Sequence, residues 1–570
     1  MIIIKCRATI ILLIFAFSSI RAQVSFPKQE VRAVWLTTIG GLDWPGSYAQ
    51  SSAGAERQKQ QLCEILDKLQ AIHINTILLQ TRVRSTVIYP SVYEPWDGCF
   101  SGKPGVSPGY DPLAFAIEEC HKRGMELHAW VVAFPACKII AAKQLGKQSL
   151  PVKQPGICRK AGDMWMLDPG LPGTAEYLAR ICTEITQNYD IDGIHLDYIR
   201  YPEKEVPFND NMTYNKYGHG KNKQQWRRDN VTHCVRSIYQ AVKVQKPWVR
   251  VSCSPVGKYS DLTRFSSFGW NAYHAVNQDA QGWLKEGIMD MLFPMMYFQG
   301  NHFYPFALDW KESSHQRIII PGLGVYMLSP QEKDWSLDVI QRETAFLRSI
   351  DADGQAFFRS RFLTDNVKGI YDYLKYGPYA FPALTLPMKW ADSIAPSNPE
   401  GLKNLQTGTT LHLAWQAATD NISGTYVTYN LYRSKTYPVD ISNPINLIKN
   451  GIRGTAYALS PISPFDTAHY YALTACDRFG NESKATSFNR PEKTPSKLLT
   501  VENDTLTIPF SDVDFILITD ATGKHVLTGK SQKRISVSKL KPGYYMIRTL
   551  EKKGLSRRIG DFIIKQTAKN

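Results

Sequence analysis

An alternation of short apolar strands and amphipathic helices runs along residues 31–386 and constrains the fold more than any other feature. The strand pattern occurs eight times, and stretches with apolar residues at helical spacing lie between the strands, as at residues 55–69, 112–123 and 173–188. Eight such units in about 360 residues predict an α/β fold, a closed parallel (β/α)8 barrel of the TIM type. A doubly wound sheet is the alternative, but no glycine-rich phosphate loop follows the first strand.

The predicted barrel strands lie at residues 32–38, 76–82, 126–132, 193–198, 250–254, 289–297, 317–323 and 354–359. After the seventh strand, Ser329, Pro330 and Glu332 have the spacing of a capping box with proline at the first helical position. This pattern predicts that a helix begins directly after Ser329.

Two small all-β domains are predicted after the barrel, because helical spacing stops near residue 396 and Thr, Tyr, Asn and Ser become frequent. We expect a barrel over residues 24–392, a β-sandwich over 393–490 and a small β domain over 497–570. The sandwich resembles a fibronectin type III module at residues 413–415, 429–433 and 470–477. The last domain resembles a Bacteroidetes secretion sorting domain at residues 541–545 and 562–565, and a second carbohydrate-associated β-sandwich is the alternative.

The amino terminus has the form of a secretory signal peptide over residues 1–23. Lys5 and Arg7 precede 13 uncharged residues, a stretch too short to span a membrane. No later stretch is long and apolar enough to do so, so we expect an exported protein that is periplasmic, at the cell surface or extracellular. The net charge of +16 is scattered and forms no basic stripe, which together with export argues against a nucleic-acid partner.

The cysteines and histidines predict no metal site and no cofactor. Nine cysteines follow the predicted signal peptide, with no Cys-x-x-Cys pair, and the histidines lack ligand spacing. An odd number cannot pair completely within one chain. A disulfide among Cys99, Cys137 and Cys158 remains open, because these three cysteines lie in loop-like segments.

The carboxyl end of the fourth predicted strand carries the first candidate catalytic residue. Functional side chains of such barrels project from the carboxyl ends of the strands. The period of two places His195 and Asp197 on one face of the strand. A carboxylate there is costly to bury unless it is paired or functional. We expect Arg200 to hold it ionised, and a structural salt bridge is the alternative.

Polar and aromatic residues at other strand ends converge on the same rim. Aromatic rings can stack on sugars, and arginine or histidine can bind hydroxyls or carboxylates. The predicted substrate-binding residues are Arg82, Arg84, His128, Trp130, His195, Arg200 and Tyr297. Their natural partner is a polysaccharide or glycan strand.

Several runs of the predicted barrel resemble the glycosyl hydrolase-like 10 family of secreted bacterial proteins. They lie at residues 30–35, 89–96, 110–113, 121–130, 165–170, 192–202, 226–230 and 254–255. The resemblance implies a (β/α)8 glycoside hydrolase. A characterised branch acts on peptidoglycan glycan strands that lack stem peptides, whereas many members have no assigned substrate.

Glycoside hydrolysis usually needs two carboxyl groups. We expect Asp197 to act as nucleophile or base. Glu94 lies beside Pro95 and Trp96, which would partly desolvate its carboxyl and suit it to donate a proton. Asp168 is a second candidate, and its alternative role is to cap the helix that begins near residue 173. If Asp197 had no partner across the cleft, a non-catalytic glycan-binding or scaffold protein would be favoured.

Overall fold

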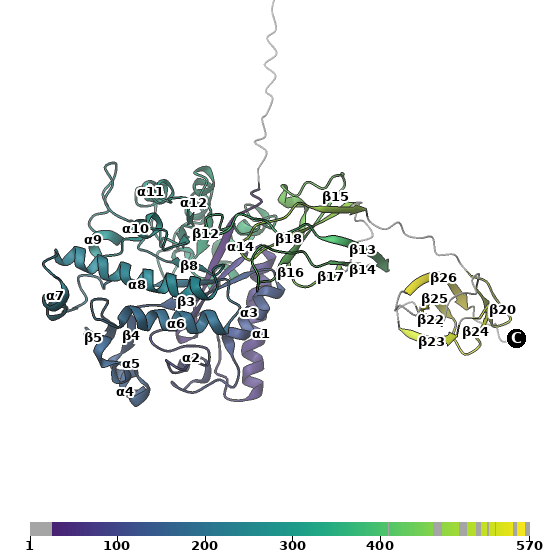
Figure 1. The fold of residues 1–570 in the computed structure, drawn as a ribbon, viewed down its shortest axis with the longest axis horizontal. Coiled ribbons are helices and arrows are strands. Elements are labelled where there is room, and N and C mark those ends of the chain that lie inside the picture. The colour runs from purple at the N-terminus through teal and green to yellow at the C-terminus, as the bar shows by residue number, and fades with distance from the viewer. Residues whose placement is uncertain are drawn as a thin grey trace, which may run out of the picture. The chain divides into compact units, whose positions relative to one another are not determined.

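The computed structural model describes residues 26–407, 410–459, 470–489, 499–508, 515–520, 524–530, 532–550 and 556–564 (Figure 1). The predicted signal peptide lies outside these residues. The chain divides into two compact units, which are described separately. The first unit comprises the chain up to Leu402 with residues Trp415–Thr455 and Thr467–Phe488, and the second comprises Lys403–Ala414, Ala456–Asp466 and Asn489–Asn570.

A parallel sheet forms the centre of the first unit, and its strands follow the sequence prediction closely. They are β1 (Val31–Leu36), β2 (Thr76–Arg82), β3 (Glu126–Val132), β7 (Gly193–Asp197), β8 (Arg250–Cys253), β9 (Met291–Leu292), β10 (Ile318–Ile319), β11 (Gly322–Leu323) and β12 (Gly354–Phe357). Their order in the sheet is β10-β9-β8-β7-β3-β2-β1-β12-β11.

The two edge strands of this order are halves of one strand, so the sheet closes. Only Ile320 and Pro321 separate β10 from β11. β10 pairs with β9, β11 pairs with β12, and the amide of Gly322 also donates to the carbonyl of Pro294 beyond β9 at 2.8 Å. The predicted eight-stranded (β/α)8 barrel is therefore confirmed.

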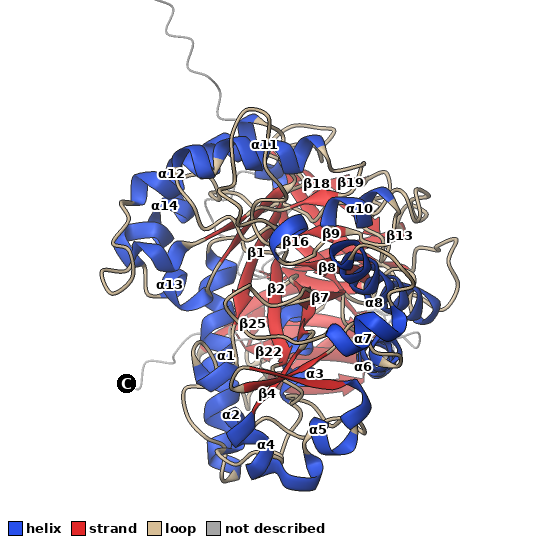
Figure 2. Cartoon of the chain, turned by 90° about the vertical axis from the view of Figure 1, so that its left-hand side faces the viewer, coloured by secondary structure: helices blue, strands red, loops and turns tan. Residues whose placement is uncertain are grey.

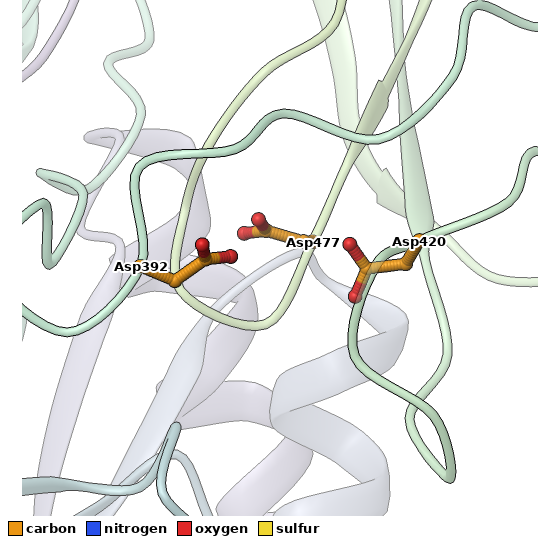
Figure 3. A group of neighbouring side chains, drawn as sticks. All are labelled: Asp392, Asp420 and Asp477. Atoms are coloured by element: carbon orange, nitrogen blue, oxygen red, sulfur yellow. The ribbon is translucent and has the colours of Figure 1, made fainter.

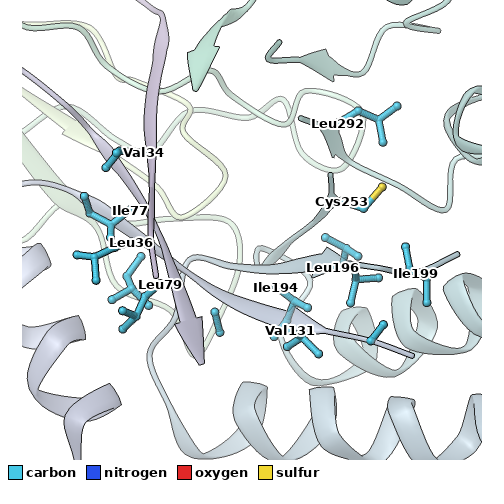
Figure 4. Packing of buried hydrophobic residues seen from close by; sticks show 14 of the residues in the cluster. Val34, Leu36, Ile77, Leu79, Val131, Ile194, Leu196, Ile199, Cys253 and Leu292 are labelled. Carbon is cyan, nitrogen blue, oxygen red and sulfur yellow. The ribbon is translucent and has the colours of Figure 1, made fainter. Parts of the chain in front are cut away.

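The two faces of the sheet carry different side chains, as the period of two requires. Apolar residues on the outer face, among them Leu79, Val131 and Ile194, pack in the layer under the helices (Figure 4). The inner face carries Trp35, Leu78, Trp130 and Phe293 together with the polar residues described below. Figure 2 shows helices covering the outside of the central strands.

The longer helices around the strands are α1 (Ser52–Ala71), α3 (Pro112–Lys122), α6 (Thr174–Asn188), α8 (Lys223–Gln245), α11 (Tyr304–Glu312) and α12 (Leu337–Ser349). Shorter ones are α2 (Gly98–Ser101), α4 (Ile139–Leu145), α5 (Leu150–Lys153), α7 (Asn211–Tyr217), α9 (Ala272–Ala275), α10 (Ala280–Lys285), α13 (Ser360–Thr364) and α14 (Ile370–Tyr376). Among the described residues, no helix is both long and apolar enough to cross a bilayer.

The helix predicted directly after Ser329 is wrong. α12 begins at Leu337, and the hydroxyl of Ser336 caps it by accepting from the amide of Asp338. The carbonyl of Ser329 accepts instead from the amides of Glu332 and Asp334, which close a turn. A capping-box pattern is compatible both with the start of a helix and with a turn of this kind. The contacts of the residues that follow decide which of these two structures forms.

An excursion between β3 and α6 forms a small antiparallel sheet of β4 (Pro135–Lys138), β6 (Met164–Leu167) and β5 (Cys158–Ala161), in the order β4-β6-β5. Cys137 and Cys158 lie on this sheet. They and Cys99 are free thiols, as are the other described cysteines.

A four-stranded antiparallel sheet completes the first unit, with β15 (Thr428–Ser434) and β18 (Tyr470–Cys476) between β16 (Leu447–Ile452) and β19 (Thr486–Asn489). Arg478, directly after β18, binds Asp190 at 2.6 Å and Asp192 at 3.2 Å, both just before β7. A cavity of about 120 Å³ lies between this sheet and the amino-terminal end of the barrel. Charged contacts therefore join the sheet to the end of the barrel opposite the predicted site.

The remaining strands form three antiparallel sheets. β13 (Glu400–Thr407), β14 (Thr410–Gln416) and β17 (Ala456–Leu459) form one, and the fibronectin type III assignment of this region stays a prediction. The carboxyl-terminal strands are β20 (Val501–Glu502), β21 (Thr505–Thr507), β22 (Phe515–Asp520), β23 (His525–Lys530), β24 (Arg534–Ser536), β25 (Gly543–Leu550) and β26 (Ser556–Ile564). They pair as β20-β21-β24 and β23-β22-β25-β26.

Candidate active site

Asp197 ends β7 on the inner face of the barrel and is 5% exposed. Three donors hold its carboxyl group. Ser254 Oγ donates to Oδ1 at 2.9 Å, the amide of Tyr198 donates to Oδ1 at 2.8 Å, and Trp130 Nε1 donates to Oδ2 at 3.1 Å. Three directed hydrogen bonds from β3, β7 and the end of β8 fix the position of this carboxyl group.

Burial raises the pKa of Asp197 above its usual value, although the hydrogen bonds and the charge of Arg200 act in the opposite direction. A carboxyl group with a raised pKa suits a proton donor. Tyr198 follows in the left-handed region, with φ of 49°, which a bulky residue rarely adopts. Its side chain is 44% exposed, so the chain reaches solvent directly after Asp197.

The predicted substrate-binding histidines lie deeper in the barrel than Asp197. His195 is fully buried and accepts from Trp35 Nε1 at 3.1 Å. Its other nitrogen must therefore carry the proton, which it donates to Ser252 Oγ at 3.0 Å. Burial holds the pKa of His195 well below its usual value, so the ring is neutral. His128 is also fully buried and contacts Glu126 at 3.2 Å. These contacts fit a structural role for both histidines.

Glu94, the predicted proton donor, forms a buried ion pair with Arg82. Arg82 donates from Nε to Oε2 at 2.8 Å and from Nη2 to Oε1 at 2.6 Å, and Tyr177 donates to Oε1 at 2.9 Å. The side chains of Arg82 and Glu94 are 0% and 1% exposed. These contacts occupy both oxygens inside the protein. They favour a structural role for Glu94 and Arg82 over the predicted catalytic and binding roles.

The ion pair between Arg200 and Asp197 that was predicted from the sequence does not form. Its Nη1 binds Glu203 Oε1 at 2.7 Å, and its guanidinium lies 4.8 Å from the centre of the Tyr198 ring. The turn at Tyr198 separates Arg200 from the strand, so the arginine reaches a carboxylate further along the loop. The charge of Arg200 still acts on Asp197 through space.

Two predicted substrate-binding residues remain partly exposed around Asp197. Tyr297 packs against Tyr326 and Phe358, with ring centres 5.6 Å apart in each case, and burial and the charge of Asp197 raise its pKa. The guanidinium of Arg84 has no hydrogen-bond or ion-pair partner within the described residues and acts electrostatically on Tyr198. Arg84 is therefore free to bind a ligand at the rim.

Asp168 is bound internally. Arg159 Nε donates to its Oδ2 at 2.7 Å, and the amide of Gly170 donates to its Oδ1 at 3.0 Å. Gly173 occupies the N-cap position of α6, so the predicted capping role of Asp168 is wrong, and its carboxyl group closes the preceding turn instead.

One group of carboxylates in the described part of the chain has spacing suited to a metal ion. Ligand atoms of Asp392, Asp420 and Asp477 lie within 4.8 Å of one another (Figure 3). One buried oxygen on each of Asp392 and Asp420 has no hydrogen-bond partner within the ranges that the structure describes. Hard cations such as Ca²⁺ prefer oxygen ligands of this kind. The group lies beside the four-stranded sheet and takes no part in the chemistry proposed for Asp197.

Three residues of the site were not predicted as such from the sequence, namely Tyr198, Ser254 and Glu203. Ser254 lies on the inner face by the same period of two that selected Asp197, so this signal was present in the sequence. Glu203 lies in an irregular loop, where no periodicity predicts a direction.

A comparison with protein families matches this barrel. The family model for glycosyl hydrolase-like 10 covers residues 30–333. The chain belongs to this family. The glycosyl hydrolase-like 10 region contains Asp197 and every other predicted site residue.

Two curated relatives of this glycosyl hydrolase-like 10 protein are glycosyl hydrolases by name. YngK of Bacillus subtilis is 28% identical over 478 residues, which cover 80% of this chain and 92% of the relative. DigH of Escherichia coli is 32% identical over 290 residues, which cover 48% of this chain and 66% of the relative.

Similar solved structures include two carbohydrate-active domains. The glycoside hydrolase domain of PgaB from Bordetella bronchiseptica has a TM-score of 0.42 and 13% identity, covering 61% of this chain and 98% of its own. The catalytic domain of a β-amylase from Paenibacillus polymyxa has a TM-score of 0.40 and 10% identity, covering 62% and 99%.

A second family model, the secretion system C-terminal sorting domain, matches residues 502–565. This match confirms the predicted sorting domain over the alternative carbohydrate-associated sandwich. The protein is exported, as its sequence predicted.

Proposed function

We propose that this exported protein hydrolyses glycosidic bonds within a polysaccharide, with Asp197 as the proton donor. The observation that supports the proposal is the state of this carboxyl group. It is buried at the carboxyl end of a barrel strand, is held by three neutral donors, and forms no ion pair with any residue in the described part of the chain. Burial without a counter-charge favours the protonated form, which can protonate a leaving oxygen.

Peptidoglycan glycan strands are the first substrate we propose. The N-acetylmuramic acid residues of such strands carry a carboxylate once the stem peptide is removed. The guanidinium of Arg84, which has no partner among the residues that the structure describes, offers a cation at the rim that could bind this group. The half-exposed ring of Tyr198 offers an apolar surface for a sugar ring beside it.

The second candidate is a glycan-binding protein without turnover. The internal ion pair of Glu94 favours it, because this pairing leaves Asp197 without the partner that the sequence analysis expected. The two candidates share a binding surface and differ in whether a bond is broken.

The test incubates the purified protein with peptidoglycan sacculi, amidase-stripped glycan strands, and plant and host polysaccharides, and analyses the products by mass spectrometry. We expect new reducing ends from stripped strands with the parent protein. We expect a loss of about 10³-fold or more in Asp197→Asn, corresponding to about 4 kcal/mol of transition-state stabilisation. Asp163→Asn is the matched control, because Asp163 is an exposed aspartate after the preceding barrel strand. Binding without products on every glycan would favour the second candidate.

A further inference from the structure

Glu203 lies six residues after Asp197, in the loop that leaves the carboxyl end of β7. Its Oε1 is 2.7 Å from Arg200 Nη1, and 33% of its side chain is exposed. Arg200 also packs its guanidinium 4.8 Å from the centre of the Tyr198 ring. Contacts through Tyr198 and Arg200 therefore connect the two carboxyl groups, and the second one is open to water.

The environments of the two carboxyl groups shift their pKa values in opposite directions. Burial raises the pKa of Asp197. Burial also acts to raise the pKa of Glu203, but the charge of Arg200 and hydrogen bonds outweigh it, so this pKa is lowered. Carboxyl pairs that divide the roles of acid and base show such a divergence.

Other acidic residues near the strand ends are less suitable. Glu94 and Asp168 have both oxygens bound inside the protein. Asp43 binds Arg359 and the amide and hydroxyl of Thr37, and its side chain is fully buried. Glu203 combines a connection to Asp197, through Arg200 and Tyr198, with exposure to solvent.

We propose that Glu203 is the second carboxyl group of the hydrolytic pair and activates the attacking water. This inference rests on the proposed function. Asp197 gives its proton to the glycosidic oxygen as the bond from that oxygen to the anomeric carbon breaks. Water attacks the anomeric carbon from the opposite face, and the Glu203 carboxylate takes the proton that the water loses. The product is a hemiacetal of inverted configuration, and proton exchange with solvent restores both carboxyl groups.

Arg200 is a positioning residue in this scheme. It binds Glu203 directly and acts on Asp197 only through space. Inverting enzymes hold their two carboxyl groups about 6.5–9.5 Å apart, because the attacking water must fit beside the sugar, and the proposed roles require such a separation when substrate is bound.

The test compares Glu203→Gln and Glu203→Ala with the parent in the full-length protein, on the glycan that the parent cleaves. We expect kcat to fall about 10³-fold in both variants with KM within a few-fold of the parent. Sodium azide should partly restore turnover in Glu203→Ala and give a glycosyl azide of inverted configuration. Glu205→Gln is the matched control, because Glu205 is exposed two residues further along the loop, and should retain parental activity.

Each outcome decides the proposal. Products of inverted configuration by NMR, together with azide rescue, would support it. Activity of Glu203→Gln within tenfold of the parent, or a retained configuration, would overturn it while leaving the proposed hydrolase function intact. A variant that loses its melting transition and shows no azide rescue would make Glu203 structural and also overturn the proposal. A parent without activity on any glycan would remove the proposed function and this inference together.

Discussion

Glu343 is a buried carboxyl group whose effect on stability can be worked out from the structure. It lies on α12, is 1% exposed, and neither of its oxygens has a hydrogen-bond partner among the described residues. Burial raises its pKa to about 9, against the opposing charge of Arg342. The folded protein therefore keeps this proton between pH 5 and pH 8, whereas the unfolded chain releases it.

Proton linkage determines whether Glu343 makes the fold more or less stable as the pH rises. Because the folded pKa is raised, the native state binds more protons than the unfolded state across this range, and stability falls as pH rises. One proton changes the free energy of unfolding by about 1.4 kcal/mol per pH unit. From pH 5 to pH 8 the carboxyl group should thus destabilise the fold by about 4 kcal/mol.

The variant Glu343→Gln removes the titration and nearly preserves the shape. We expect the free energy of unfolding of the variant, minus that of the parent, to rise by about 4 kcal/mol between pH 5 and pH 8. Urea unfolding followed by tryptophan fluorescence at several pH values measures this difference. Asp338→Asn, at an exposed position on the same helix, is the matched control for the loss of a carboxyl group. A constant difference for Glu343→Gln would refute the reasoning, because Glu343 would then ionise normally in the folded protein.

Three further predictions concern the site and its support. Ser254→Ala removes a hydrogen bond that favours the Asp197 carboxylate, so the pKa of this proton donor should rise. In the pH profile of kcat/KM, the fall in activity on the alkaline side should therefore occur about one pH unit higher than in the parent. Glu94→Gln should lower the free energy of unfolding by about 3 kcal/mol, because Arg82 stays buried without its counter-charge, while turnover of folded protein changes less than tenfold. Arg478→Met should lower the melting temperature of the first unit without changing KM, because Asp190 and Asp192 at the far end of the barrel each lose one of their charged partners; an unchanged melting temperature would contradict this.

The sequence by itself determined the architecture and the first catalytic candidate. β2 and β3 have the predicted bounds, because buried parallel strands are continuous apolar runs that differ sharply from the helices between them. The period of two also placed Asp197 on the inner face, where the structure finds it. Both results depend only on local periodicity, which can be recognised in the sequence without knowledge of the fold.

Only the tertiary structure decided which polar groups meet. Trp130 and Ser254 reach Asp197 from positions 67 and 57 residues away, and their hydrogen bonds depend on the register between strands. The pairing of Arg200 with Glu203, and not with Asp197, depends on a single turn at Tyr198 with an unusual φ. The orientation of a side chain in an irregular loop depends on its tertiary contacts in the folded protein. The periodicity of the sequence does not predict these contacts.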